Sequence, residues 1–131
     1  MTTRSIELRQ QPLAAWLDQL ESIAALPENW DSYGASRIAP SAVTTARALL
    51  NELTVRALPP DRLLPFHIAP IPTGGIQFEW KGRDRSALEL WIDGEGQIDA
   101  VFDRPTTEPR IVEKHLTSIA VAAAEIEAFV A

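Results

Sequence analysis

The spacing of apolar residues changes once along this chain, and the change limits the folds that it can adopt. Before Pro59, apolar residues recur every three or four positions, as they do on one side of an α-helix. Between Phe66 and Phe102 they alternate with polar residues in short runs, and glycine-containing segments separate these runs. Helices followed by a series of alternating segments predict an α+β fold with an antiparallel sheet.

Two helices are expected before the sheet and one after it. The first covers residues 12–26, because proline suits a first helical position and Pro27 ends the pattern. The second begins after Pro40 and stops at the Pro59-Pro60 pair. The third is predicted over residues 111–130, where apolar residues follow alternating steps of four and three. It is expected to pack on one face of the sheet.

Four strands are expected to form an antiparallel meander between the second and third helices. Each connecting segment contains glycine, which adopts the backbone conformations that tight hairpins need. The predicted strands are residues 66–71, 76–81, 87–92 and 97–102. The whole chain, residues 1–131, is expected to form a single domain, in which residues 1–10 are either a flexible arm or an edge strand.

The register of the last two predicted strands separates the two faces of the sheet. Pairing around the loop at 93–96 places Ile92 opposite Ile98, and a slip of one residue would exchange the faces. One face then carries only apolar side chains: Ile76, Phe78, Trp80, Leu88, Leu90, Ile92, Ile98, Ala100 and Phe102. This face is expected to form the core beneath the helices.

The opposite face is expected to be polar and mildly acidic, and it carries the candidate partner-binding residues. These are Glu79, Glu89, Trp91 and Asp99. Carboxylates on neighbouring strands repel one another unless a cation or a partner lies close to them. A tryptophan among carboxylates is typical of a contact surface. The alternatives are a solvated face with Lys81 nearby, or cover for Trp91 by the first ten residues or another subunit.

A second candidate segment is the loop between the first two helices, which contains Trp30, Asp31 and Tyr33. Two aromatic rings and an acid are more than a simple connector needs. One interpretation is structural: both rings fold back onto the core, Asp31 accepts backbone N–H bonds, and Gly34 adopts a left-handed turn. The alternative is a small-ligand or hydrolytic site between this loop and the sheet edge.

Composition and the remaining motifs give little support to catalysis or to nucleic-acid binding. The net charge of −6, without a basic cluster, disfavours nucleic acid and anionic membranes. The absence of cysteine fits a cytoplasmic protein, and neither a signal sequence nor a membrane span is expected. Because His67 and His115 lack a second ligand at metal spacing, no metal or cofactor is expected. No nucleophile motif is present, so catalytic residues are not predicted.

The motifs WDSYGA at residues 30–35 and PIPTGGIQFEW at residues 70–80, with the acidic strand Leu-Glu-Leu at 88–90, resemble a loosely defined family of small bacterial proteins with no established function. The resemblance extends over residues 26–100. It implies a stand-alone cytosolic protein that acts as an antitoxin, an immunity protein or a phage-encoded inhibitor. It implies no catalytic residue.

Together these features predict a non-enzymatic interaction module that binds a protein partner with a basic surface through the acidic sheet face. The identity of the partner does not follow from the sequence. A further hypothesis is a homodimer, in which the alanine-rich C-terminal helix packs against a second copy. The small residues that would permit this close approach are Ala120, Ala122, Ala123 and Ala124.

Overall fold

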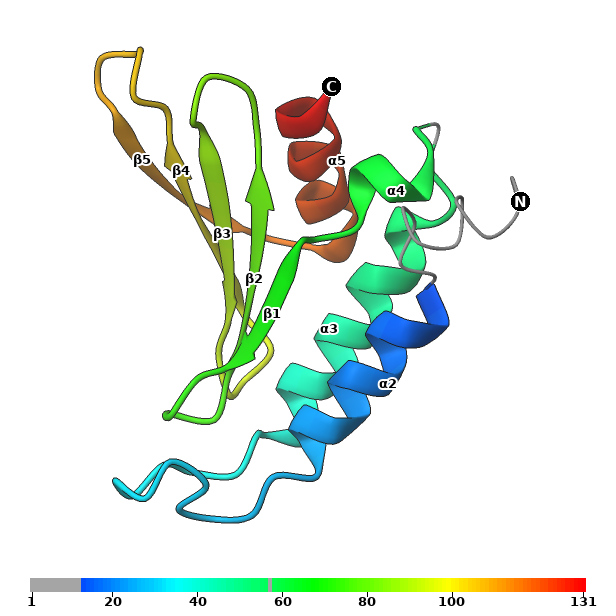
Figure 1. Ribbon diagram of the computed structural model, residues 1–131, viewed down its shortest axis with the longest axis vertical. Coiled ribbons are helices and arrows are strands. Elements are labelled where there is room, and N and C mark those ends of the chain that lie inside the picture. Colours follow the sequence, from blue (N-terminus) through cyan, green and yellow to red (C-terminus); the bar gives the residue numbers. More distant parts are fainter. Residues whose placement is uncertain (1–12, 57) are drawn as a thin grey trace, which may run out of the picture.

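The computed structural model describes residues 13–56 and 58–131, and it has a sheet layer and a helical layer (Figure 1). The helices are α2 (Leu13–Ala24), α3 (Pro40–Leu53), the one-turn α4 (Pro60–Leu63) and α5 (Ile119–Val130). The strands are β1 (His67–Pro70), β2 (Ile76–Lys81), β3 (Ala87–Ile92), β4 (Ile98–Asp103) and β5 (Ile111–Leu116). They form one antiparallel sheet in the order β1-β2-β3-β4-β5, so the α+β prediction is confirmed.

The two N-terminal helices pack through the apolar positions that predicted them. In α2 the buried residues are Trp16, Leu20 and Ile23, at steps of four and three. Helix α3 begins at Pro40, a position where a backbone N–H would have no partner within the helix, so its absence in proline costs nothing. Residues 1–10, interpreted above as an arm or an edge strand, lie outside the described part of the chain.

The predicted C-terminal helix over residues 111–130 is wrong in its first third. Residues 111–116 form β5, which pairs with β4, and the helix starts only at Ile119. The spacing of Val112 and Leu116 explains the error, because a step of four residues returns to the same face of a strand as well as of a helix. Ser118 marks the true start of α5, since its hydroxyl accepts a bond from the N–H of Val121 at 3.1 Å.

The other strands agree with the prediction to within a residue at each end. The register is also confirmed, since Ile92 pairs with Ile98, Leu90 with Ala100, and Leu88 with Phe102. The sheet therefore has five strands rather than four, and β5 extends both of its faces beside β4.

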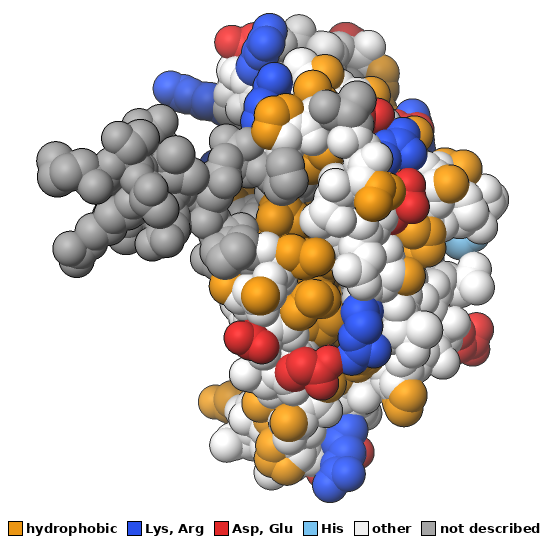
Figure 2. Space-filling model, turned by 90° about the vertical axis from the view of Figure 1, so that its right-hand side faces the viewer, with side chains coloured by type: hydrophobic (Ala, Val, Ile, Leu, Met, Phe, Trp, Pro, Cys, Tyr) orange, Lys and Arg blue, Asp and Glu red, His pale blue; other side chains and the backbone are white. Residues whose placement is uncertain are grey.

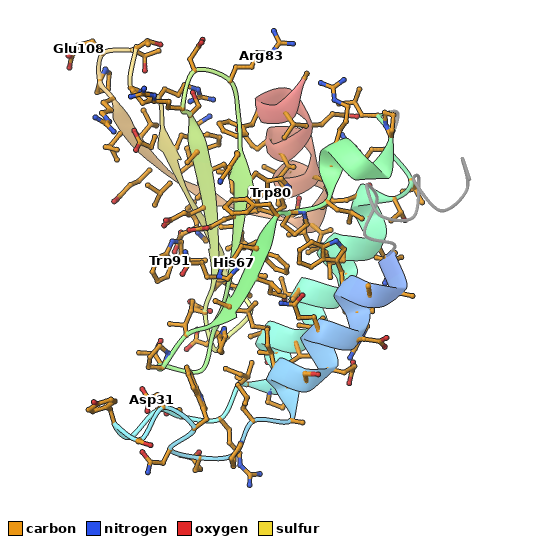
Figure 3. All side chains as sticks on the ribbon, in the orientation of Figure 1. Asp31, His67, Trp80, Arg83, Trp91 and Glu108 are labelled. Atoms are coloured by element: carbon orange, nitrogen blue, oxygen red, sulfur yellow. The ribbon has the colours of Figure 1, made fainter. Side chains whose placement is uncertain are left out.

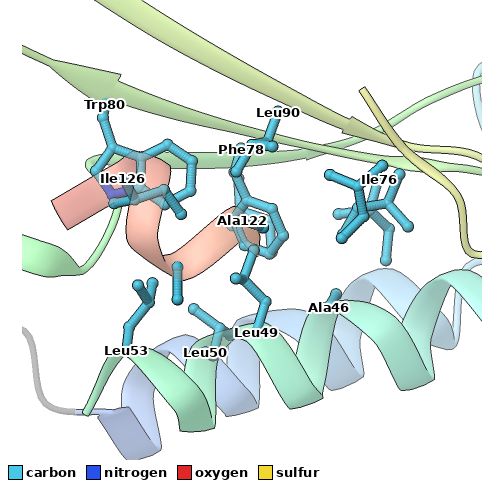
Figure 4. Packing of buried hydrophobic residues seen from close by; sticks show 14 of the residues in the cluster. Ala46, Leu49, Leu50, Leu53, Ile76, Phe78, Trp80, Leu90, Ala122 and Ile126 are labelled. Carbon is cyan, nitrogen blue, oxygen red and sulfur yellow. The ribbon is translucent and has the colours of Figure 1, made fainter. Parts of the chain in front are cut away.

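The core lies between the apolar face of the sheet and the helices α2, α3 and α5 (Figure 4). Phe78 is fully buried, and the indole Nε1 of Trp80 donates to the carbonyl oxygen of Leu63 at 2.7 Å. In α5, Ala122 and Ala123 are buried in this core, whereas Ala120 and Ala124 are exposed. Two of the four alanines proposed for a helix-to-helix dimer thus already pack within one copy of the chain.

Figure 2 views the molecule from its helical side, where a band of hydrophobic side chains runs between charged groups of both signs. Within the described ranges, no helix combines the length and the apolar character needed to cross a membrane.

The two glycines nearest the end of β3 provide a matched test of the packing there. A Cβ on Gly75 would lie less than 3.0 Å from the carbonyl oxygen of Ile92, whereas a Cβ on Gly94 would make an ordinary 3.7 Å contact with Ala39. We expect Gly75→Ala to lower the free energy of unfolding by roughly 1–3 kcal/mol, and Gly94→Ala to change it by less than about 1 kcal/mol in either direction. Urea denaturation measures both. Equal effects would show that β2 and β3 do not approach each other as described.

Candidate functional site

The face of the sheet that points away from the helices carries every residue that the sequence proposed for partner binding. Strand pairing places Glu79 directly opposite Glu89, and Trp91 directly opposite Asp99. We call this surface the open face. It is formed by the outward side chains of β1 to β5, and Trp91 is labelled on it in Figure 3.

Strand β5 adds two polar residues to the open face that sequence reasoning missed. Glu113 lies opposite Val101, and His115 lies opposite Asp99. Because residues 111–116 were assigned to a helix, neither side chain could be placed beside the acidic strands. The Thr117-Ser118 pair before α5 was the available signal, since serine is a common N-cap and marks where the helix begins.

The open face is hollowed above β3, β4 and β5. The hollow has a volume of about 530 Å³, and the outward side chains around it come from all three strands. These are Glu89, Trp91, Asp99, Val101, Glu113 and His115. Trp91 is 39% exposed, and its indole Nε1 donates to Glu89 Oε2 at 3.1 Å. An aromatic ring and carboxylates therefore border one concave surface.

Three carboxylates on the open face lack a basic partner within the described residues. No side-chain nitrogen of a lysine or arginine there lies within 4.0 Å of a carboxylate oxygen of Glu79, Glu89 or Glu113. Asp99 differs, because its Oδ1 lies 2.9 Å from His115 Nδ1. Within the described residues, the carboxylate of Glu79 accepts only a 3.4 Å bond from the side-chain amide of Gln77. The negative charge is thus left largely to the solvent.

Three basic side chains on or beside these strands contact other groups. The ammonium of Lys81 lies 4.5 Å from the centre of the Phe66 ring. Arg110 pairs with Asp103 at 2.7 Å across the β4–β5 hairpin, and this guanidinium holds the pKa of Asp103 below its usual range. Lys114 points to the helical side of the sheet, where its Nζ lies 3.1 Å from Glu125 Oε1.

Neither histidine belongs to a cluster of potential metal ligands. His67 lies opposite Glu79 at the end of the open face formed by β1, and His115 lies on β5, at the other edge. Among residues 13–56 and 58–131, no group of three or more histidine, aspartate or glutamate side chains is arranged to hold a metal ion.

The structural interpretation of the loop between α2 and α3 is correct for Asp31 and Gly34 but not for both aromatic rings. Asp31 Oδ1 accepts the backbone N–H groups of Tyr33 at 2.8 Å and Ala35 at 3.0 Å, and Gly34 has a φ of 87°, as predicted. Trp30 is half-buried. The prediction that both rings fold onto the core is wrong for Tyr33, which is 92% exposed. The bonds to Asp31 shape the loop without any contribution from this ring.

The same loop does not contribute to the hollow on the open face. A small-ligand or hydrolytic site would need a concave surface and a carboxylate shielded from water. Trp30, Asp31 and Tyr33 do not line the hollow on the open face, and no charged or polar side chain of the described residues is buried. A small-ligand or hydrolytic site at this loop stays a prediction.

Comparison with known proteins found no matching family model, no matching curated protein and no matching solved structure. The resemblance of residues 30–35 and 70–80 to a bacterial family stays a prediction.

Repulsion between Glu79 and Glu89 can be measured in the isolated protein. We expect Glu79→Gln to raise the free energy of unfolding by a few tenths of a kcal/mol, because like charges directly opposite each other destabilise a sheet. The gain, followed by urea denaturation, should shrink as salt screens the charges. Gln77→Glu is the matched control of opposite sign and should lower stability. A loss of stability in Glu79→Gln would contradict the inference that Glu79 and Glu89 repel each other without a compensating positive charge.

Proposed function

We propose that this protein is an interaction module that binds a protein partner with a basic surface, and that it does so through the open face. The observation that carries the proposal is the hollow bordered by Trp91, Glu89 and Glu113, in which the carboxylates have no lysine or arginine partner among the described residues. A partner that brings arginine or lysine to this surface supplies the missing countercharge.

The chemistry of the hollow suits a guanidinium group. Arginine stacks its planar head on aromatic rings and donates paired hydrogen bonds to carboxylates. Trp91 offers a ring that is partly exposed, and Glu89 lies beside it. A cation over tryptophan gains roughly 0.5–2 kcal/mol, and the gain is larger where water is excluded.

The acidic residues are spread out in a way that suits a protein rather than a single ion. Glu79, Glu89, Asp99 and Glu113 lie on four successive strands, β2 to β5. Neighbouring strands are about 4.8 Å apart, so Glu79 and Glu113 are separated by about 14 Å. A single metal ion or a small cation cannot contact groups so far apart. Several basic side chains on one partner surface can.

A non-enzymatic role accords with this arrangement. The carboxylates lie on an open, solvent-facing surface, and catalysis by carboxylates usually relies on a pocket that perturbs them. A small acidic protein that covers a basic surface of another protein would suit the antitoxin, immunity or inhibitor role that the motif resemblance implies.

The test is the affinity for a partner captured from the native cell, identified by mass spectrometry and then purified. We expect the double variant Trp91→Ala, Glu89→Ala to weaken binding at least about 100-fold, since each residue lies in the centre of the proposed contact. Calorimetric titration measures this loss, and binding should also weaken as salt is raised.

The matched control is the double variant Val55→Ala, Asp18→Ala. It likewise removes one exposed apolar side chain and one exposed carboxylate, but from the helical layer. Its affinity should equal that of the unmodified protein. If the open-face variant binds as tightly as this control, the open face is not the binding surface.

A further inference from the structure

We propose that the α2–α3 loop is a second contact point for the same partner, and that Tyr33 inserts into an apolar slot beside the basic surface of that partner. This inference rests on the proposed function of the open face. It gives a role to a side chain that the fold itself does not use.

The exposure of Tyr33 has no structural explanation within the described residues. The ring is 92% exposed, the highest value among the exposed large hydrophobic side chains. Only its backbone N–H takes part in the loop, as a donor to Asp31. A tyrosine that buries no area adds nothing to the core, whereas exposed tyrosine is a preferred anchor in protein recognition.

The loop that carries Tyr33 is held in one shape by its own polar groups. Asn29 Oδ1 accepts the N–H of Gly34 at 2.6 Å, and the indole Nε1 of Trp30 donates to the Ser36 carbonyl oxygen at 3.0 Å. Asn29 and Ser32 have positive φ angles of 60° and 66°. Non-glycine residues keep this conformation only where surrounding bonds determine it. A loop ordered in advance loses little entropy when it binds.

Backbone bonds also fasten the loop to one end of the sheet. The N–H of Ser36 donates to the Pro72 carbonyl oxygen at 2.8 Å, and the N–H of Ala39 donates to the Gly74 carbonyl oxygen at 2.9 Å. Both acceptors belong to the β1–β2 turn. Trp91 is the next-to-last residue of β3 and pairs with Gln77 near this same end. The loop and Trp91 therefore hold fixed positions relative to each other.

Figure 3 shows Asp31 beyond the end of the strands, on the side of the sheet where Trp91 projects and opposite the helices. In Figure 1 the loop leaves α2, extends past the β1–β2 turn to that same side, and then returns to α3. The loop thus lies at the border of the open face, where a partner that covers the hollow would also contact it. The chemistry of Tyr33 defines what the partner presents there, namely an apolar slot with a hydrogen-bond acceptor for the phenol hydroxyl.

Site-specific photo-crosslinking in the native cell tests whether one protein contacts both places. A benzophenone-bearing phenylalanine analogue replaces Tyr33 in one variant, Gln77 on the open face in a second, and Ala48 on the exposed side of α3 in a third. We expect the same protein to be crosslinked from positions 33 and 77, and not from position 48.

The outcomes separate the two proposals. If position 77 captures a protein that position 33 does not, the loop contact is overturned and the open-face function stands. If position 33 alone captures a protein, or if neither position does, the open-face function fails and this inference fails with it.

A second, quantitative test measures the affinity of this protein for the partner that crosslinking has identified, once that partner has been purified on its own. Tyr33→Ala should weaken binding at least about tenfold, with little change in the melting temperature because Tyr33 is 92% exposed. Tyr33→Phe should retain part of that affinity, since it keeps the ring and loses only the hydroxyl. A loss below twofold in Tyr33→Ala would overturn the proposed anchor.

Discussion

The burial of one face of the sheet is the constraint on which the rest of the structure depends. Side chains alternate strictly along each strand, so a register that brings Phe78, Leu90 and Ala100 together must place Glu79, Glu89 and Asp99 together on the other face. Helices α2, α3 and α5 cover the apolar side, and no helix of the described residues lies on the other side. The acidic surface is thus a geometric consequence of how the core is formed.

Much of the fold could be predicted from the sequence because local spacing and turn residues agree with the tertiary structure. The central strands β2, β3 and β4 have clear alternation and short turns, and their register followed from keeping one face apolar. Strand β5 could not be predicted in the same way. Val112 and Leu116 fit either a helix or a strand, and only pairing with β4 decides between them. Pairing between segments is a property of the whole chain, which local spacing does not contain.

The candidate site was likewise predicted in its chemistry but not in its full extent. Glu79, Glu89, Trp91 and Asp99 share a face as expected, because alternation alone brings them together. The hollow depends on β5 as well, and that strand was not predicted. The orientation of the Tyr33 ring was not predicted either, for a different reason. Whether an aromatic side chain in a loop turns inward depends on the whole loop. Here the side chains of Asn29 and Asp31 accept backbone N–H bonds and shape the loop without using the phenol. The sequence indicated a structured loop but not the direction of that ring.

The position of Lys114 affects whether another chain can add a strand to the β5 edge of the sheet. An outer strand offers unpaired backbone groups to which a foreign strand could add, and a charge turned inward at that strand discourages such addition. Lys114 is such a residue on β5, held on the helical side by Glu125, and at the opposite margin β1 is short and ends in Pro70. Both margins of the sheet are therefore poorly suited to continued strand pairing. The open-ended assembly of copies into fibrils, which needs exposed strand edges, is therefore discouraged.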